Sequence, residues 1–148
     1  MTDYSSLIRD AKALVEDSPS QITTLSNLSA LLNERLGFIN WVGFYLYEGG
    51  RLILGPFQGR VACTVIAIGK GVCGTAAQRK ETVVVPNVHE FEGHIACDSA
   101  SNSEIVIPVL KNGELFGVLD IDSPVFDRFT EEDRIGLEGL VRATEKIL

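Results

Sequence analysis

Two strand–turn–strand segments in the middle of the chain constrain the fold more than any other feature. Residues 40–57 read NWVGFYLYEGGRLILGPF, with aromatic and branched side chains on both sides of Gly49-Gly50. Residues 104–123 read EIVIPVLKNGELFGVLDIDS and turn at 111–113. Aromatic and β-branched residues around a glycine-containing turn are typical of a β-hairpin. We therefore expect two antiparallel hairpins.

Helical patterns flank the hairpins. A first helix is expected over about residues 4–16. The sequence Ser18-Pro19-Ser20-Gln21 reads as a capping box with proline at the first helical position. Thr130-Glu131-Glu132-Asp133 begins a last helix that runs to the end of the chain. The second helix is expected to carry an apolar stripe and to stop at Gly37, the stripe being formed by Ile22, Leu25, Leu28, Leu32 and Leu36.

Two shorter apolar runs complete the pattern. TVIAI at 64–68 and TVVVP at 82–86 are expected to be buried strands, with a short helix near 72–79 between them. Helices at both ends with hairpins between them favour an α+β domain built on an antiparallel sheet. A chain of 148 residues suits one domain, 1–148.

Composition excludes several classes of partner. The formal net charge is −7 and the sequence pI is about 4.8. Nucleic-acid binding depends mainly on Lys and Arg neutralising phosphates, so neither nucleic acid nor an anionic membrane surface is an expected partner. The N-terminus has no basic region followed by an apolar segment, and a cytoplasmic location is expected. Three cysteines in such a compartment argue against a permanent disulfide framework.

The irregular segment 86–103 has no sustained period. Loops longer than about 12–15 residues are uncommon in compact domains and are usually functional or disordered. This segment contains apolar anchors, so we expect it to be ordered. Cys97 lies in it among Gly, His, Asp, Ser and Asn. An unperturbed thiol is only about 3% thiolate at pH 7, but the polar setting favours a reactive role over an inert thiol.

Zinc and dinucleotide sites are two weaker alternatives. His89, His94 and Cys97 have ligand-like spacing, and Cys63 or Cys73 can complete a tetrahedron. No C-x2-C pair supports them, so no metal is expected. GKGVCG at 69–74 matches G-x-G-x-x-G formally, but hairpins follow it instead of repeated βαβ units. A tight turn that opens the short helix is the preferred interpretation.

Acidic residues on the second hairpin are a stronger signal. Asp120 and Asp122 alternate with apolar residues, so both point to one face of their strand, as a buried cluster or as a solvated strand end. The position of Glu104 depends on the turn. A two-residue turn pairs Lys111 with Glu114 and puts Glu104 on the face opposite Asp120. A three-residue turn pairs Glu104 directly with Asp120, and only this second register gathers three acids.

Trp41 and Tyr45 fall on one face of their strand with Gly43 between them. They are expected to be core aromatics or an apolar wall for a small ligand. In the second case Gly43 leaves room between the rings.

In chain order, NWVGFY, LGPFQG, GKGVCG, GHIACDSASNSEIVIP and GVLDIDSP resemble the free methionine-(R)-sulfoxide reductases, small enzymes of the GAF fold. The resemblance covers about residues 20–140 and is most specific around Cys97. It implies a GAF-like α+β fold with about six antiparallel strands, terminal helices packed on one face and a long ordered active-site loop. One departure is VACT at 61–64, where Pro-Ala-Cys is more usual; Cys63 itself is in place.

The resemblance also implies the chemistry. The enzyme would reduce free L-methionine (R)-sulfoxide through a cysteine sulfenic acid and an intramolecular disulfide, without a bound cofactor, and thioredoxin would recycle it. Cys97 would be the nucleophile, Cys63 the resolving thiol and Cys73 a second resolver. The substrate would contact three acids, two aromatic rings and backbone amides of the loop, namely Glu104, Asp120, Asp122, Trp41, Tyr45, Ile95 and Ala96.

A second interpretation is a non-catalytic GAF-type module that binds a small ligand or senses redox state. It would bind without turnover. The sequence leaves the oligomeric state open, with a homodimer as one candidate.

Overall fold

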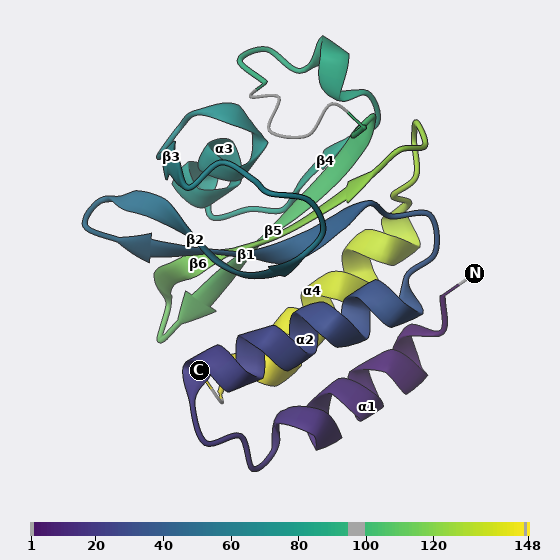
Figure 1. The fold of residues 1–148 in the computed structure, drawn as a ribbon, viewed down its shortest axis with the longest axis vertical. Helices are drawn as coiled ribbons and strands as arrows, with labels where there is room; N and C mark the ends of the chain where they lie inside the picture. The colour runs from purple at the N-terminus through teal and green to yellow at the C-terminus, as the bar shows by residue number, and fades with distance from the viewer. Residues whose placement is uncertain (1, 95–99, 147) are drawn as a thin grey trace.

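The computed structural model describes residues 2–94, 100–146 and 148. A six-stranded antiparallel sheet of order β3-β2-β1-β6-β5-β4 separates two layers of helices (Figure 1). None of the helices in these residues is long and apolar enough to cross a membrane. The α+β fold with six antiparallel strands is confirmed. Its strands are β1 (Trp41–Glu48), β2 (Arg51–Gln58), β3 (Val65–Ala67), β4 (Val83–Val85), β5 (Ser103–Lys111) and β6 (Glu114–Ser123).

The terminal helices cover one face of the sheet. α2 (Gln21–Arg35) packs on β1 and β2, α4 (Glu131–Glu145) packs on β5, and α1 (Tyr4–Val15) lies across α2 and α4 (Figure 1). The larger apolar core fills this layer, and its fully buried members include Leu28, Leu32, Ile107, Ile121 and Leu140.

The opposite face carries a smaller layer. α3 (Gly71–Arg79) packs on β3, β4, β5 and β6, and the 3-10 turn η1 (Val88–Glu90) lies in the segment that follows β4. A second apolar core includes Trp41, Tyr45 and Val106. Because both faces of the central strands are covered, side chains that point to the α3 layer are removed from water as well.

α2 begins two residues later than the sequence suggests. Ser20, not Ser18, is the N-cap, and its hydroxyl accepts a hydrogen bond from the Thr23 amide at 3.1 Å. The Ser18 hydroxyl instead donates to the Ser20 carbonyl and accepts from Thr24. The expected apolar stripe holds except at Ile22, which is 70% exposed in the first turn.

Both short apolar runs form edge strands, and neither is a fully buried strand. Within the described residues, β3 pairs only with β2 and β4 pairs only with β5. Val65 is 47% exposed while its neighbour Ile66 is buried, because only one side of this edge strand faces the core.

The second hairpin has a register that differs from both expected ones. Its turn has two residues, with Asn112 and Gly113 at positive φ and Lys111 paired with Glu114. The register then shifts by one residue, because Leu110 pairs with Leu115 but Val109 pairs with Gly117. This bulge leaves Phe116 as the extra residue. It follows that Glu104 pairs with Asp122, so a two-residue turn does gather three acids on one face.

The contact between α1 and α4 generates a stability prediction. A Cβ at Gly136 would lie 2.2 Å from the ring of Tyr4, whose hydroxyl donates a hydrogen bond to Asp133 at 2.6 Å and so holds the ring in place. Gly136→Ala should lower the free energy of unfolding by about 1–3 kcal/mol through overpacking.

Gly139→Ala is the matched control on the same helix. Its Cβ would lie 3.3 Å from the flexible end of Ile8, so helix propensity should make this variant neutral or up to about 1 kcal/mol more stable. Urea denaturation measures both. Equal effects of the two substitutions would show that the Tyr4 ring does not fix this contact.

Candidate active site

A pocket lies on the α3 side of the sheet, between the first turn of α3 and strands β1, β5 and β6. The empty space in it, including its open mouth, amounts to about 530 Å³. Its lining combines aromatic, acidic and thiol side chains: Trp41, Tyr45, Ala62, Ile66, Lys70, Gly71, Val72, Cys73, His94, Ser101, Glu104, Asp120 and Asp122.

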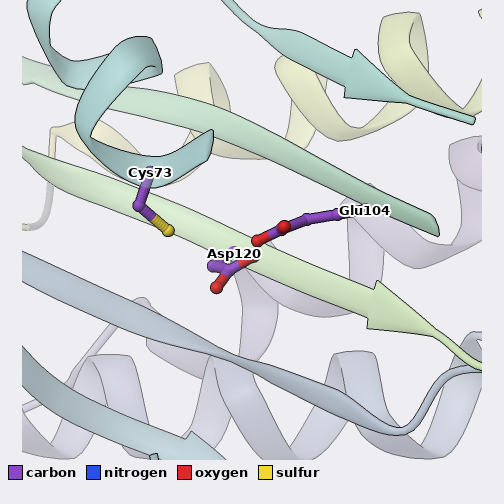
Figure 2. Close-up of side chains that lie close together, drawn as sticks. All are labelled: Cys73, Glu104 and Asp120. Atoms are coloured by element: carbon purple, nitrogen blue, oxygen red, sulfur yellow. The ribbon is translucent and has the colours of Figure 1, made fainter. Parts of the chain in front are cut away.

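The three expected acids meet in this pocket. Glu104 on β5 lies directly opposite Asp122 on β6, and Asp120 lies two residues earlier on the same face. Glu104 is only 7% exposed and Asp120 6%, so the alternative of a solvated strand end is wrong for Asp120. Figure 2 shows the carboxyl group of Glu104 directed toward Asp120, and the sulfur of Cys73 close to Asp120 on the other side.

The acids have few partners for their negative charge. Among the described residues, no salt bridge reaches any of the three, and the buried Oδ1 atoms of Asp120 and Asp122 have no hydrogen-bond partner. Burial, reinforced by the charges of Asp120 and Asp122, raises the pKa of Glu104 well above its usual range. Burial and the Asp120 charge raise the pKa of Asp122 in the same direction. The cluster therefore retains a proton where ordinary carboxyl groups have lost theirs.

The two aromatic residues predicted for the site form one wall of the pocket. The rings of Trp41 and Tyr45 are stacked, with centroids 5.9 Å apart. The Trp41 Nε1 donates a hydrogen bond to the Arg60 carbonyl at 3.1 Å, and the Tyr45 hydroxyl donates to the Cys63 carbonyl at 2.8 Å. Both rings are almost fully buried and held at their polar ends, which makes the wall rigid.

Gly43 has a different role from the one expected. A Cβ at this position would lie 2.2 Å from the Cβ of Phe57 on β2. Phe57 also stacks on Trp41, with centroids 5.2 Å apart. The space beside Gly43 is therefore occupied by Phe57, and the glycine permits strand packing, not ligand entry.

The thiols differ in their surroundings. Cys73 on α3 is a free, buried thiol, and burial, reinforced by the charge of Asp120, raises its pKa well above the usual value. Cys63 is disulfide-bonded and follows the pocket residue Ala62. The predicted nucleophile Cys97 and the predicted loop residues 95 and 96 (Ile95 and Ala96) lie outside the described residues.

Sequence reasoning missed the contribution of the first turn of α3. The GKGVCG segment does form the expected turn, with the Gly69 amide bonded to the Gly74 carbonyl at 2.8 Å. Its residues Lys70, Gly71 and Val72 also line the pocket. Among the described residues no side chain caps this helix, and its partially positive N-terminus lies at the pocket. The sequence signal that could have indicated this was a glycine-containing turn before a helix with no capping residue, because such a helix leaves its first amide groups unpaired.

The two histidines differ in their position relative to the pocket. His94 lines the pocket, and burial, followed by the charge of His89, lowers its pKa, which favours the neutral ring. His89 Nε2 instead forms a hydrogen bond with Asn102 Oδ1 at 2.8 Å. In the described part of the chain, the group with metal-like spacing is a different one: Cys73, Glu104 and Asp120, whose ligand atoms all lie within 4.8 Å of one another.

Known proteins share this sequence and this fold. Residues 21–147 match the GAF domain family. The free methionine-R-sulfoxide reductase of Escherichia coli (strain K12) is 56% identical over 145 residues, which span 98% of this chain and 88% of that protein. The reductase of Saccharomyces cerevisiae (strain ATCC 204508 / S288c) is 43% identical over 95% of this chain and 82% of its own length.

A solved structure extends the comparison. The fRMsr of Staphylococcus aureus in complex with its substrate superposes with a TM-score of 0.96 at 55% identity, covering 100% of this chain and 97% of that one. The sequence identity and the fold agree over nearly the whole chain, as the motif resemblance predicted. The chain therefore belongs to the GAF domain family and, within it, to the free methionine-R-sulfoxide reductases.

Proposed function

We propose that residues 1–148 form a single catalytic domain that reduces free L-methionine (R)-sulfoxide to L-methionine. The observation that supports this most is the buried acid cluster opposite a rigid aromatic wall. A small molecule with an apolar methyl–sulfur end and a polar, cationic end fits such a pocket.

The substrate groups can be matched to the pocket by their chemistry. The S-methyl end lies against the rings of Trp41 and Tyr45. The ammonium group pairs with the carboxylates of Asp120 and Asp122, whose Oδ1 atoms have no partner among the described residues. The carboxylate lies toward the first turn of α3 and, from the resemblance, toward the loop amides of 95 and 96.

This arrangement accounts for selection of the free amino acid. Methionine sulfoxide inside a peptide has neither the ammonium nor the carboxylate group. It would leave the buried acids without a cation, and unpaired buried charges are costly. Discrimination against peptides therefore comes from the electrostatics of the pocket as well as from its size.

The acid pair Glu104–Asp122 supplies a proton to the sulfoxide oxygen. Two carboxyl groups that face each other in a buried site cannot both ionise, so one proton is shared near neutral pH. Protonating the oxygen turns it into a better leaving group and makes the sulfur more electrophilic. Glu104, the more buried of the two, is the assigned donor.

The sulfur chemistry then proceeds in balanced steps. The Cys97 thiolate attacks the sulfur of the protonated sulfoxide and forms a transient S–S bond. The hydroxyl group then passes from the methionine sulfur to the Cys97 sulfur as the S–O and S–S bonds to methionine break, which leaves a sulfenic acid on Cys97 and releases methionine. The Cys63 thiol attacks the sulfenic sulfur, forming a disulfide and releasing water. Thioredoxin, a dithiol of the cytoplasm, reduces that disulfide by thiol exchange and is itself oxidised. No bound cofactor takes part.

The bonding state of the two described cysteines supports Cys63 as the resolving residue. Cys63 is the disulfide-bonded cysteine, whereas Cys73 is a free thiol. Burial also disfavours the Cys73 thiolate, and the thiolate is the attacking form.

A turnover assay is the primary test. The purified protein is incubated with each sulfoxide epimer of free methionine and with dithiothreitol, and methionine is quantified. The R epimer should be converted in many equivalents per enzyme, and the S epimer should persist. A protein that binds methionine sulfoxide in calorimetry but releases no methionine would be a sensing module, and the proposed function would be wrong.

The roles of the cysteines are tested by single-turnover kinetics. Cys97→Ser should release no methionine. Cys63→Ser should release about one equivalent and then stall with thioredoxin, because the sulfenic acid has no partner thiol. The matched Cys73→Ser variant retains the Cys63 thiol and should support repeated turnover. If Cys73→Ser stalls and Cys63→Ser does not, the resolver is Cys73.

Glu104→Gln tests the proton donor. The reduction rate should fall by about 10²-fold or more, as expected when a general acid is lost.

The same variant also tests the protonation of Glu104. Because the pKa of Glu104 is raised in the folded state, the wild-type protein loses stability as pH rises from the unfolded pKa toward the folded one. The uncharged variant lacks this loss, so its stability relative to the wild type should increase as the pH rises above the ordinary glutamate pKa of about 4.3.

Thermal denaturation across that pH range measures the difference. Glu114→Gln, at an exposed position on the same hairpin, is the control and should change neither stability nor rate. A Glu104→Gln variant that is uniformly less stable at every pH would contradict a protonated Glu104.

A further inference from the structure

We propose that Cys73, Glu104 and Asp120 form a binding site for a thiophilic divalent cation such as Zn²⁺, and that this cation inhibits the enzyme by occupying the substrate pocket. Cation binding is argued from the geometry of the three side chains. Only the inhibition rests on the proposed function.

Three different elements bring the donor atoms together. The Sγ of Cys73 comes from the first turn of α3, and the carboxylates of Glu104 and Asp120 come from β5 and β6. All three side chains are buried and point toward one another (Figure 2). Their ligand atoms lie within 4.8 Å of one another, and tetrahedral zinc would require separations of roughly 3.5 Å.

The unpaired oxygen of Asp120 indicates that the cluster accepts a positively charged ligand. Its side chain is buried, with a relative exposure of 6%, yet its Oδ1 has no hydrogen-bond partner in residues 2–94, 100–146 and 148. No Lys, Arg or His in that part of the chain forms an ion pair with Asp120 or Glu104. A bound cation would give the Oδ1 of Asp120 a partner and, once Glu104 has lost its proton, would compensate the charge of both carboxylates.

The donor set selects the kind of cation. One thiolate and two carboxylates suit Zn²⁺, Co²⁺ or Cd²⁺, whereas Mg²⁺ and Ca²⁺ prefer oxygen-only sites. Three protein ligands leave a fourth position for water. On binding, the Cys73 thiol and the carboxyl group of Glu104 each give a proton to the buffer. Because Cys73 is the free thiol, the site does not compete with the disulfide for its sulfur.

Inhibition follows from the shared ligands. Glu104 is the assigned proton donor and Asp120 a partner of the substrate ammonium, so cation and substrate cannot use them together. The inhibition should therefore be competitive with free methionine sulfoxide.

Cobalt binding to full-length variants tests the site directly. In Cys63→Ser/Cys97→Ser, Cys73 is the sole thiol, and Co²⁺ should give a thiolate-to-cobalt charge-transfer absorption that Zn²⁺ abolishes and that excess Mg²⁺ leaves intact. The cysteine-free triple variant with Cys73→Ser added is the matched control and should show no such band. Adding Glu104→Gln or Asp120→Asn to the double variant should weaken Co²⁺ binding at least tenfold.

Absence of the band in the double variant, or an affinity that neither acid substitution changes, would overturn the proposed site. With the wild-type enzyme, Zn²⁺ should raise the apparent KM for methionine sulfoxide without lowering the maximal rate. Cobalt binding without such competition would overturn the inhibition alone. A protein that binds Co²⁺ through Cys73 and reduces no sulfoxide would instead disprove the proposed function and leave the cation site standing.

Discussion

The repulsion among three buried carboxyl groups is the interaction on which the account of this protein depends. Glu104, Asp120 and Asp122 share one face of the β5–β6 ladder, with no ion-pair partner among the described residues. Such a cluster must hold a proton or receive a cation, because desolvated like charges are otherwise unfavourable. In the proposed function, the substrate ammonium supplies the cation and the sulfoxide oxygen accepts the proton. A site of this kind lowers stability in exchange for reactivity.

The apolar core on the other side of the sheet offsets this loss of stability. The larger core lies between the sheet and helices α2 and α4, away from the acids, and contains most of the fully buried aliphatic side chains. The smaller α3 layer can therefore contain buried polar groups without making the fold unstable. Its aromatic wall is fixed by the hydrogen bonds of Trp41 and Tyr45, so the pocket is formed before a ligand binds.

Sequence periodicity predicted the sheet and the shared face of Asp120 and Asp122 correctly, because alternation is a local property of a strand. It did not predict the pairing of Glu104. That pairing depends on a bulge at Phe116, and one inserted residue leaves no trace in the apolar pattern on either side of it. The N-cap of α2 was predicted at Ser18 and is at Ser20 for a similar reason, since either serine satisfies the local preference for an N-cap residue.

Other features required information from distant parts of the chain. Gly43 suggested space for a ligand, but a residue of the neighbouring strand, Phe57, fills that space. The first turn of α3 reaches the pocket only because the helix packs over β5 and β6. The motifs around Cys97 carried the assignment of the nucleophile by resemblance, and that assignment stays a prediction.

The central claim is that the acid cluster is protonated in the resting enzyme near neutral pH. Carbon-detected NMR of the ¹³C-labelled full-length protein, with Glu104→Gln for assignment, follows each side-chain carboxyl through a pH titration. The account predicts that the Glu104 carbon titrates far above the solvent-exposed glutamates. A Glu104 signal that titrates together with those of the exposed glutamates would contradict it.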